Sequence, residues 1–326
     1  MALRCARSMA LVADAEGRSR HRRRRGPALP TWRQLIAACG LLLCAGGAVA
    51  SHPGCGTAPA LDAAQWDRLL RVAGFIQQRL DEAAAPAALV SRSGVDLSRF
   101  ALAHSHAGIA LRAAAQPLWV VRQLYYDCAQ DRPRIFDQGL AGFLLGGTEA
   151  DAGRLSLILL AGAEGAPVRE AASDDRLAVR LLSTRYSANA HAFSTRYQNC
   201  NQWVAELLAT AWSGTTAGEA SRERAQAWLA GQAYPAHLFD IGAPWLLLGA
   251  ALLPWFKLDD HPQEDLDGAR LRVSMPSSLE AFVLRRHPAS RRLQFCWTRS
   301  HVLARSQGPE LPAGCEAGDG DELLRL

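Results

Sequence analysis

One cysteine of the sequence stands where its thiol could act as a nucleophile. Cys200 lies in the segment YQNCNQW, residues 197–203, and apolar residues follow it at helical spacing. With Asn199 as N-cap, the spacing predicts a helix over 200–212 that begins at Cys200. The free N–H groups and partial positive charge of a helix N-terminus lower the pKa of a thiol and can bind an oxyanion. The pattern therefore predicts a nucleophilic cysteine, and the other interpretation is a buried or disulfide-bonded structural cysteine.

A histidine that could serve as the base precedes Cys200 in the chain. In the segment SHAGIAL, residues 105–111, strand alternation places the larger apolar residues on one face and His106 on the other, beside Gly108. Gly108 and Ala110 are small, so they leave room for the end of a helix to approach on the histidine face. An imidazole there could accept the thiol proton and later protonate a leaving group. His104, on the same face, is the alternative base.

A third side chain is expected to orient the histidine. Two strands, at about 103–112 and 118–126, are separated by a short turn at 113–117, so they are predicted to form a hairpin. Gln123 on the second strand could then exchange a hydrogen bond with the imidazole. Asp127, at the end of that strand, is a charged alternative.

The order of these motifs resembles that of a known superfamily. The HAGI strand comes before the NCNQW helix start, whereas papain-like enzymes place the cysteine first. The reversed order resembles the circularly permuted papain-like, NlpC-like superfamily, which includes the lecithin retinol acyltransferase type. In that superfamily the orienting residue lies on the strand after the histidine, commonly as a second histidine, and Gln123 occupies the matching position here. The resemblance implies Cys200 as nucleophile, His106 as base and Gln123 as orienting residue.

The chain more closely resembles a secreted bacterial family known as domain of unknown function twenty-one forty-five. Residues 105–109, residues 197–203 and the region of Cys315 carry this resemblance. Together the resemblances imply an α+β, permuted papain-like fold with an antiparallel sheet packed on helices. They imply one domain over 51–326 with a C-terminal extension from about residue 240. The implied function is a cysteine hydrolase or acyltransferase that acts on a cell-wall peptide or a lipid acyl group.

Two other functions would use the same residues differently. His104 and His106, two apart on one strand face, could bind a zinc ion together with Cys200 or His191, although a His-x-His pair alone is a weak signal. The chain could also be a secreted binding or envelope module on the same scaffold, without catalysis. We favour the thiol enzyme, for which neither a metal nor a cofactor is expected.

The first fifty residues are predicted to be a secretory signal peptide that is cleaved before Ser51. Arg22–Arg25 precede an apolar run over 35–49, which is followed by small residues. The run is shorter than the roughly 20 residues of a spanning helix, which disfavours an uncleaved anchor. A lipoprotein signal ending at Cys39 would leave almost no apolar core. The predicted location is periplasmic or secreted.

The basic residues of the chain are concentrated in this leader. Residues 1–50 hold nine arginines against Asp14 and Glu16, while the whole chain has a formal charge of +5. The mature chain is therefore close to −2 and lacks a polybasic patch. On this ground nucleic acid is not expected as a partner.

Five cysteines follow residue 50, which is an odd number for an oxidising compartment. If Cys200 carries the free thiol, the other four can form two disulfides in any of three pairings. These four are Cys55, Cys128, Cys296 and Cys315.

Other segments show helix or strand patterns. An amphipathic helix is predicted over 62–80, with Asp62 and Gln65 as a capping box. The segment from Ile241 to Phe256 is almost wholly apolar but contains two prolines, and a buried core element is favoured over peripheral contact with a membrane. Further predictions are a helix over 136–145, a strand over 155–160, a loop over 161–167, a helix over 174–186, a strand over 271–275, a helix capped by Ser277, a strand over 293–298 and an irregular tail after Gly314.

Overall fold

A computed structural model describes residues 61–112, 118–147, 151–306 and 308–326. The predicted signal peptide at 1–50, the turn at 113–117 and Cys55 lie outside the described residues. All described residues belong to one structural unit, His52–Leu326.

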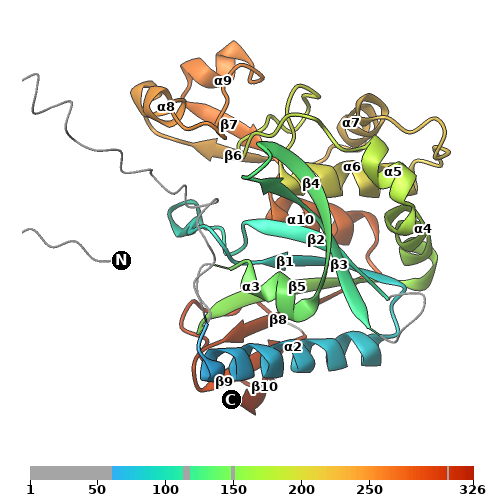
Figure 1. The fold of residues 1–326 in the computed structure, drawn as a ribbon, viewed down its shortest axis with the longest axis vertical. Helices are drawn as coiled ribbons and strands as arrows, with labels where there is room; N and C mark the ends of the chain where they lie inside the picture. The colour runs from blue at the N-terminus through green and yellow to red at the C-terminus, as the bar shows by residue number, and fades with distance from the viewer. Residues whose placement is uncertain (1–60, 113–117, 148–150, 307) are drawn as a thin grey trace, which may run out of the picture. The chain divides into compact units, whose positions relative to one another are not determined.

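The centre of the described structure is an eight-stranded antiparallel sheet with strand order β10-β9-β8-β5-β1-β2-β3-β4 (Figure 1). Its strands are β1 (Ala87–Arg92), β2 (His106–Arg112), β3 (Trp119–Asp127), β4 (Arg132–Gly139), β5 (Gly153–Leu160), β8 (Arg291–Trp297), β9 (His301–Arg305) and β10 (Glu322–Arg325). A separate small sheet pairs β6 (His237–Asp240) with β7 (Arg270–Val273), also antiparallel. The predicted α+β character and the antiparallel sheet are confirmed.

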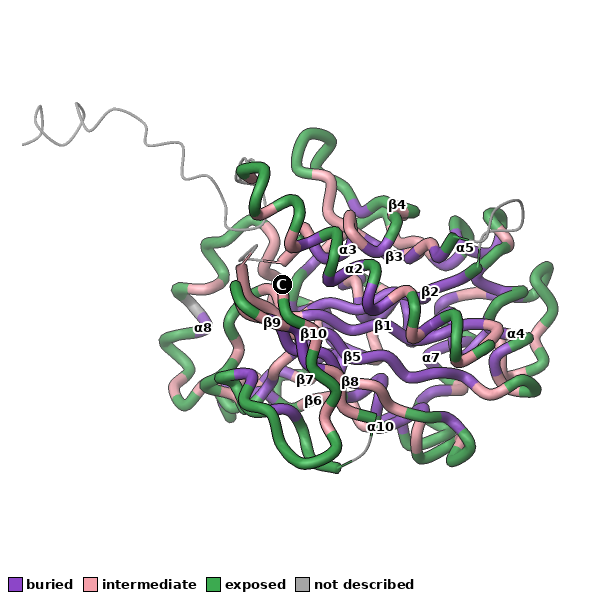
Figure 2. The backbone as a smooth tube through the Cα atoms, turned by 90° about the horizontal axis from the view of Figure 1, so that it is seen from below, coloured by how far each residue is buried: buried purple, intermediate pink, exposed green. Residues whose placement is uncertain are grey.

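Helices cover both faces of the large sheet. On one face lie α2 (Ala63–Ala83) and α3 (Leu140–Leu145), whose apolar side chains pack against the central strands. The helices that share a core with the other face are α4 (Gly162–Ser173), α5 (Asp175–Arg180), α6 (Cys200–Trp212), α7 (Arg222–Gly231) and α10 (Pro276–Arg286). The central strands are consequently buried between two helical layers (Figure 2).

Strong local signals produce the elements that position the candidate site. The predicted N-terminal helix is α2, where the Gln65 N–H donates to Asp62 Oδ1 at 2.7 Å and the Asp62 N–H donates to Gln65 Oε1 at 3.0 Å. The predicted hairpin strands are β2 and β3, which pair antiparallel. The helix predicted to begin at Cys200 is α6, and it begins there. A cap combined with a clear period is enough to specify these elements.

Other elements differ from prediction because tertiary pairing outweighs local sequence. The sequence pattern does not predict β1, whose residues are all buried, because a strand covered on both faces has no apolar–polar alternation. Residues 136–139 belong to β4 rather than to a helix because they pair with β3. Residues 162–167 begin α4 rather than a loop, even though Pro167 lies inside that helix. The helix predicted over 174–186 ends at Arg180.

The apolar segment from Ile241 to Phe256 is not the buried core element that was favoured. It forms α8 (Pro244–Ala250) followed by turns, and Trp245 is 69% exposed. Leu252 is 85% exposed, although Leu247 is buried in a small core with β6 and β7. No helix of the described residues is long and apolar enough to cross a membrane.

The elements after α8 follow the prediction only in part, and α9 (Gln263–Asp267) and β9 (His301–Arg305) were not predicted. Short α9 precedes β7, and β7 and β8 correspond to the strands predicted over 271–275 and 293–298. The helix α10 begins after Met275 without a side-chain cap, so Ser277 does not have the predicted capping role. The predicted irregular tail contains β10, which pairs with β9.

Candidate active site at the start of α6

Cys200 is the first residue of α6, and polar contacts fix the start of that helix. Asn199 Oδ1 accepts from the Gln202 N–H at 2.7 Å, which is the expected N-cap. Gln202 Nε2 donates to the carbonyls of His191 and Ser194, both at 3.1 Å, in the loop that precedes the helix. Cys200 is partly buried and its thiol is free. The thiol therefore lies at a well-defined position.

The N-terminus of α6 meets the beginning of β2. Asn201 Nδ2 donates to the Ser105 carbonyl at 3.2 Å. The ladder between β2 and β3 starts further along β2, so it does not use the N–H of Ala107, which faces the sulfur of Cys200 instead. The structure thus brings the thiol beside the residue that directly follows His106.

The helix approaches β2 from the face opposite to the expected one. Apolar residues of α6 share a core with Ala107, whereas the His106 ring lies on the other face of the strand, against Phe143 of α3. The space beside Gly108 is filled by β3, because a Cβ there would lie 2.7 Å from Val121 Cγ1. The expectation that the helix end uses that space is therefore wrong. Gly108 allows a close approach of β3, and α6 reaches the neighbourhood of the histidine at the strand end.

The imidazole of His106 is buried and held by neighbouring side chains. Its Nε2 lies 2.7 Å from Gln123 Oε1. Its ring stacks on Tyr125 with the centroids 4.6 Å apart, and Phe143 packs on it at 5.9 Å. Tyr125 was not a candidate from the sequence, but its position two residues after Gln123, on the same strand face, is the signal that could have identified it.

A second glutamine sets the direction of the hydrogen bond to the histidine. Gln123 Nε2 donates to Gln138 Oε1 of β4 at 2.7 Å, so the oxygen of Gln123 faces the imidazole. His106 therefore donates from Nε2. In a neutral imidazole this leaves Nδ1 as an acceptor, which is the nitrogen that could take a proton from a thiol.

Burial, rather than the helix terminus, dominates the protonation of both groups. Burial raises the pKa of Cys200 to about 11, although the charge of Arg92 and the backbone N–H groups at the helix start act to lower it. Burial lowers the pKa of His106 to about 3, together with the charge of Arg92, whereas the hydrogen bond to Gln123 acts to raise it. The expectation of a lowered thiol pKa is therefore wrong. At neutral pH the thiol and the imidazole are both uncharged.

The alternative base and the alternative orienting residue have other partners. His104 Nδ1 lies 3.9 Å from Glu280 Oε1 of α10, and burial lowers the pKa of His104 to about 3. Asp127 forms an ion pair with Arg134 at 3.3 Å. The hydrogen bond to Gln123 distinguishes His106 from His104 as the candidate base.

The three histidines of the suggested zinc site face different surroundings. His104 is directed to Glu280, and His106 to Gln123. The ring of His191 lies 5.4 Å from that of His261. Within the ranges that the structure describes, no group of three or more His, Cys, Asp and Glu side chains could hold a metal ion.

Of the cysteines in the described residues, one has a free thiol and the others are disulfide-bonded. Cys296 and Cys315 form a disulfide with Cα atoms 5.5 Å apart. Cys128 is also disulfide-bonded, which leaves Cys200 as the free thiol among the cysteines in the described ranges. The prediction that Cys200 is the odd thiol is consistent with this pattern.

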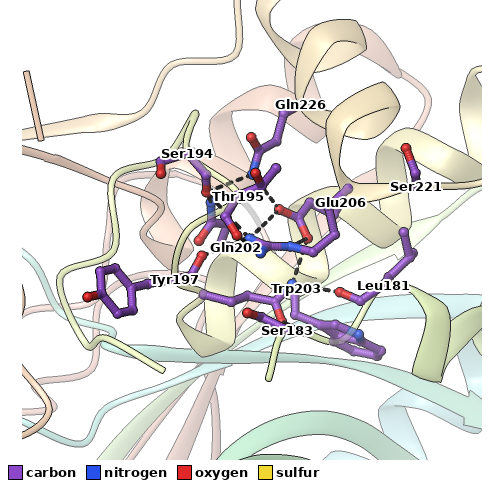
Figure 3. Close-up of polar contacts among 12 residues, drawn as sticks. Leu181, Ser183, Ser194, Thr195, Tyr197, Gln202, Trp203, Glu206, Ser221 and Gln226 are labelled. Atoms are coloured by element: carbon purple, nitrogen blue, oxygen red, sulfur yellow. Dashed lines mark hydrogen bonds and ion pairs between the residues drawn. The ribbon is translucent and has the colours of Figure 1, made fainter. Parts of the chain in front are cut away.

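A buried ion pair supports the segment that leads into α6 (Figure 3). Arg222 Nε of α7 donates to Glu206 Oε2 of α6 at 2.9 Å, and both side chains are buried. Arg222 also donates to the carbonyls of Thr195 and Tyr197, at 2.6 and 2.8 Å. The ion pair therefore ties two helices to the residues that precede the cysteine.

Two glutamines complete this network. Gln226 Nε2 donates to Glu206 Oε1 at 2.7 Å and to the Ser194 carbonyl at 3.0 Å. Gln198 Nε2 donates to Glu206 Oε2 at 2.6 Å. Burial raises the pKa of Glu206, while the charge of Arg222 lowers it. The only sign of this network in the sequence is Glu206, a carboxylate within the apolar pattern of α6.

The chain matches a protein family that is described as an uncharacterized protein conserved in bacteria (DUF2145). The match covers residues 79–283, which is more than half of the chain. The chain belongs to this family. The matched region contains β2, β3 and α6, so Cys200, His106 and Gln123 all lie within it. No curated protein and no solved structure matches the chain.

Proposed function

We propose that this member of the family is an exported thiol hydrolase or acyltransferase with a permuted papain-like, NlpC-like fold. The observation that carries the proposal is the 2.7 Å contact between His106 Nε2 and Gln123 Oε1, next to a helix that begins with the free thiol of Cys200. A nucleophile, a base and a group that orients the base form the minimal set for covalent acyl transfer. A purely structural cysteine requires neither of the other two groups.

The neutral resting pair favours a general-base mechanism over a preformed ion pair. His106 Nδ1 would take the thiol proton of Cys200 as the sulfur attacks the carbonyl carbon of an amide or ester. The resulting imidazolium would then protonate the leaving amine or alcohol as the carbon–heteroatom bond breaks, which yields a thioester and a neutral imidazole. Water or an acceptor hydroxyl or amine would resolve the thioester by the same steps in reverse order.

The start of α6 offers donors for the developing oxyanion. The backbone N–H groups of Cys200, Asn201 and Ala107 all face the sulfur. An oxyanion formed on the attacked carbonyl would lie two bonds from that sulfur, where preorganised N–H groups can stabilise it. The same groups lie in a largely water-excluded site, since His106 is buried.

The surroundings of the site are consistent with two substrate classes. A cell-wall peptide would supply an amide, and the Cys296–Cys315 disulfide, which suits an oxidising compartment, supports the proposed export. A lipid acyl group would supply an ester. The exposed Trp245 of α8 and the exposed Leu252 that follows this helix favour peripheral contact with a membrane, where such esters are found.

Trapping of the covalent intermediate tests the proposal. The native protein is incubated with p-nitrophenyl acetate, and the modified peptide is identified by mass spectrometry. We expect an acetyl group on Cys200 and release of p-nitrophenol, both lost in Cys200→Ala. Cys200→Ser, which keeps the size of the side chain, controls for packing. A native protein whose Cys200 stays unmodified would contradict the proposal and favour the binding module.

The zinc alternative has a separate readout. Elemental analysis of protein purified without an affinity tag is expected to give far less than one zinc per chain. Stoichiometric zinc that disappears in a His104→Gln variant would favour the metal site over the thiol mechanism.

A further inference from the structure

Arg92 is a buried cation without a carboxylate partner. It is 3% exposed, and among the described residues no carboxylate lies within ion-pair distance of it. Its Nη1 donates to the Ser93 carbonyl at 2.9 Å and its Nη2 donates to the Tyr125 hydroxyl, while Nε has no partner in the described structure. By contrast, buried Arg222 is fully paired with Glu206.

An unpaired buried charge is strongly unfavourable unless a ligand or another charge compensates it. The ring of Phe143 lies 5.3 Å from the guanidinium carbon of Arg92 and compensates it only in part. The remaining N–H donors are arranged in the planar fork that matches a carboxylate. Among the described residues, nothing supplies the carboxylate that would fully compensate the charge of Arg92.

The position of Arg92 links that anion to the candidate catalytic pair. Arg92 is directly opposite His106 in the register between β1 and β2. Its charge acts on both groups, lowering the pKa of His106 and that of Cys200. The guanidinium also donates to the hydroxyl of Tyr125, whose ring stacks on His106, so a ligand bound at Arg92 would lie close to the candidate base.

Two glycines lie close to the guanidinium of Arg92. A Cβ at Gly146, which is exposed, would collide with Arg92 Nη2 and with the Tyr125 hydroxyl. A Cβ at Gly94 would lie 3.1 Å from Arg92 Nη1 and 2.7 Å from Ser105 Oγ. Any larger residue at these positions would fill the space beside the guanidinium. Both glycines therefore lie directly against the Arg92 side chain, where a larger residue could not be placed without moving it.

We propose that Arg92, with the Tyr125 hydroxyl, forms a carboxylate-binding subsite beside Cys200, so that the substrate carries a carboxylate close to the acyl group under attack. This inference rests on the proposed function, since it names the chemical class of substrate for the same site. It also gives Arg92 a role in specificity that the neutral residues of the site cannot provide.

A pair of alkylating reagents tests the subsite without knowledge of the substrate. Iodoacetate carries a carboxylate next to its reactive carbon, whereas iodoacetamide of the same shape is neutral. The rates of Cys200 alkylation by the two reagents are measured on the native protein at pH 8. The iodoacetate rate divided by the iodoacetamide rate is then compared with the same ratio for N-acetylcysteine. We expect a ratio that is higher by roughly tenfold, the low end of electrostatic focusing, and that falls in 0.5 M salt.

Variants locate the effect. Arg92→Gln is expected to bring the ratio down to that of N-acetylcysteine, and Arg92→Lys, which keeps the charge, to retain most of it. Arg299→Gln, whose side chain is 81% exposed and pairs with Asp151, should leave the ratio unchanged. If Arg92→Gln does not fold, the comparison of wild type, Arg92→Lys and the salt series still decides.

The outcomes separate the two proposals. Alkylation by both reagents with the ratio of N-acetylcysteine would overturn the subsite and leave the thiol mechanism intact. A native thiol that resists both reagents would overturn the subsite and count against the proposed function as well. An elevated ratio that Arg92→Gln does not change would overturn the role of Arg92.

Discussion

His106 Nε2 and Gln123 Oε1 lie 2.7 Å apart, on neighbouring strands of a sheet whose end meets the N-terminus of α6. This contact gives the imidazole one orientation and one tautomer. Because the partner is a neutral amide rather than a carboxylate, it does little to stabilise an imidazolium, which agrees with the pKa of about 3 for His106. The pair of His106 and Cys200 is therefore neutral at rest.

Replacement of Gln123 should change thiol reactivity in two directions. A carboxylate in Gln123→Glu would raise the pKa of His106 and favour an imidazolium–thiolate pair, so the iodoacetamide rate at pH 7 should increase. Gln123→Ala should lower acylation of Cys200 by roughly 10²-fold, because the base is no longer positioned. Rates measured from pH 6 to 11 check both, and in the wild type they should rise toward pH 11. Equal profiles for all three proteins would contradict the assignment of Gln123.

Acid should destabilise the fold through its buried histidines. The pKa values of His104 and His106 are lowered from 6.5 to about 3 by burial, so their neutral forms contribute stability above pH 6.5. This contribution is lost as the pH falls from 6.5 toward 3, at about 1.4 kcal/mol per pH unit for each histidine. Urea unfolding at pH 7, 5.5 and 4.5 measures the slope. His106→Gln should reduce the slope by the share of one histidine, and an unchanged slope would show that this imidazole is not buried as described.

The ion pair between Glu206 and Arg222 should be important for stability. Arg222→Ala leaves a buried carboxylate uncompensated, and its expected cost is about 3–5 kcal/mol in the free energy of unfolding. Arg196→Gln, in the exposed pair with Asp259, is the control and should cost less than about 1 kcal/mol. Chemical denaturation measures both. A small effect of Arg222→Ala would mean that water reaches Glu206.

The exposed apolar residues around α8 should bind lipid surfaces. Trp245 and Leu252 are 69% and 85% exposed, and burying such side chains contributes about 1.5–3 kcal/mol each. A Trp245→Ala, Leu252→Asp double variant should therefore weaken co-sedimentation with phosphatidylcholine vesicles by more than about tenfold. Val179→Asp replaces a residue on α5 that is 63% exposed, and it should have no effect. Equal binding of all three proteins would argue against a membrane role for this segment.

The sequence indicated the site residues better than their spatial arrangement. The N-cap at Asn199 and the alternation around His106 are local signals, and the elements that contain them form as expected. The face on which α6 packs depends on the whole sheet, in particular on β1, whose buried run lacks a period. A sequence pattern therefore could not show that β3 fills the space beside Gly108.

The protonation of the site was also beyond the sequence. A helix N-terminus lowers a thiol pKa by its dipole, and this local effect is present at Cys200. Desolvation depends on every neighbour in three dimensions, and here it is the larger effect. The sequence does not indicate Arg92 either, because only the register of β1 against β2 places it opposite His106.

The rate of Cys200 acetylation in two matched histidine variants tests the central claim most directly. His104 and His106 are both buried and both have a pKa of about 3, but of these two histidines only His106 is hydrogen-bonded to Gln123. With p-nitrophenyl acetate at pH 7.5, Cys200 of the His106→Asn variant should be acetylated at least about 10²-fold more slowly than Cys200 of the wild type. The acetylation rate of the His104→Asn variant should stay within a few-fold of the wild-type rate. Equal rates for wild type and His106→Asn would contradict the assignment of His106 as the base of a thiol nucleophile.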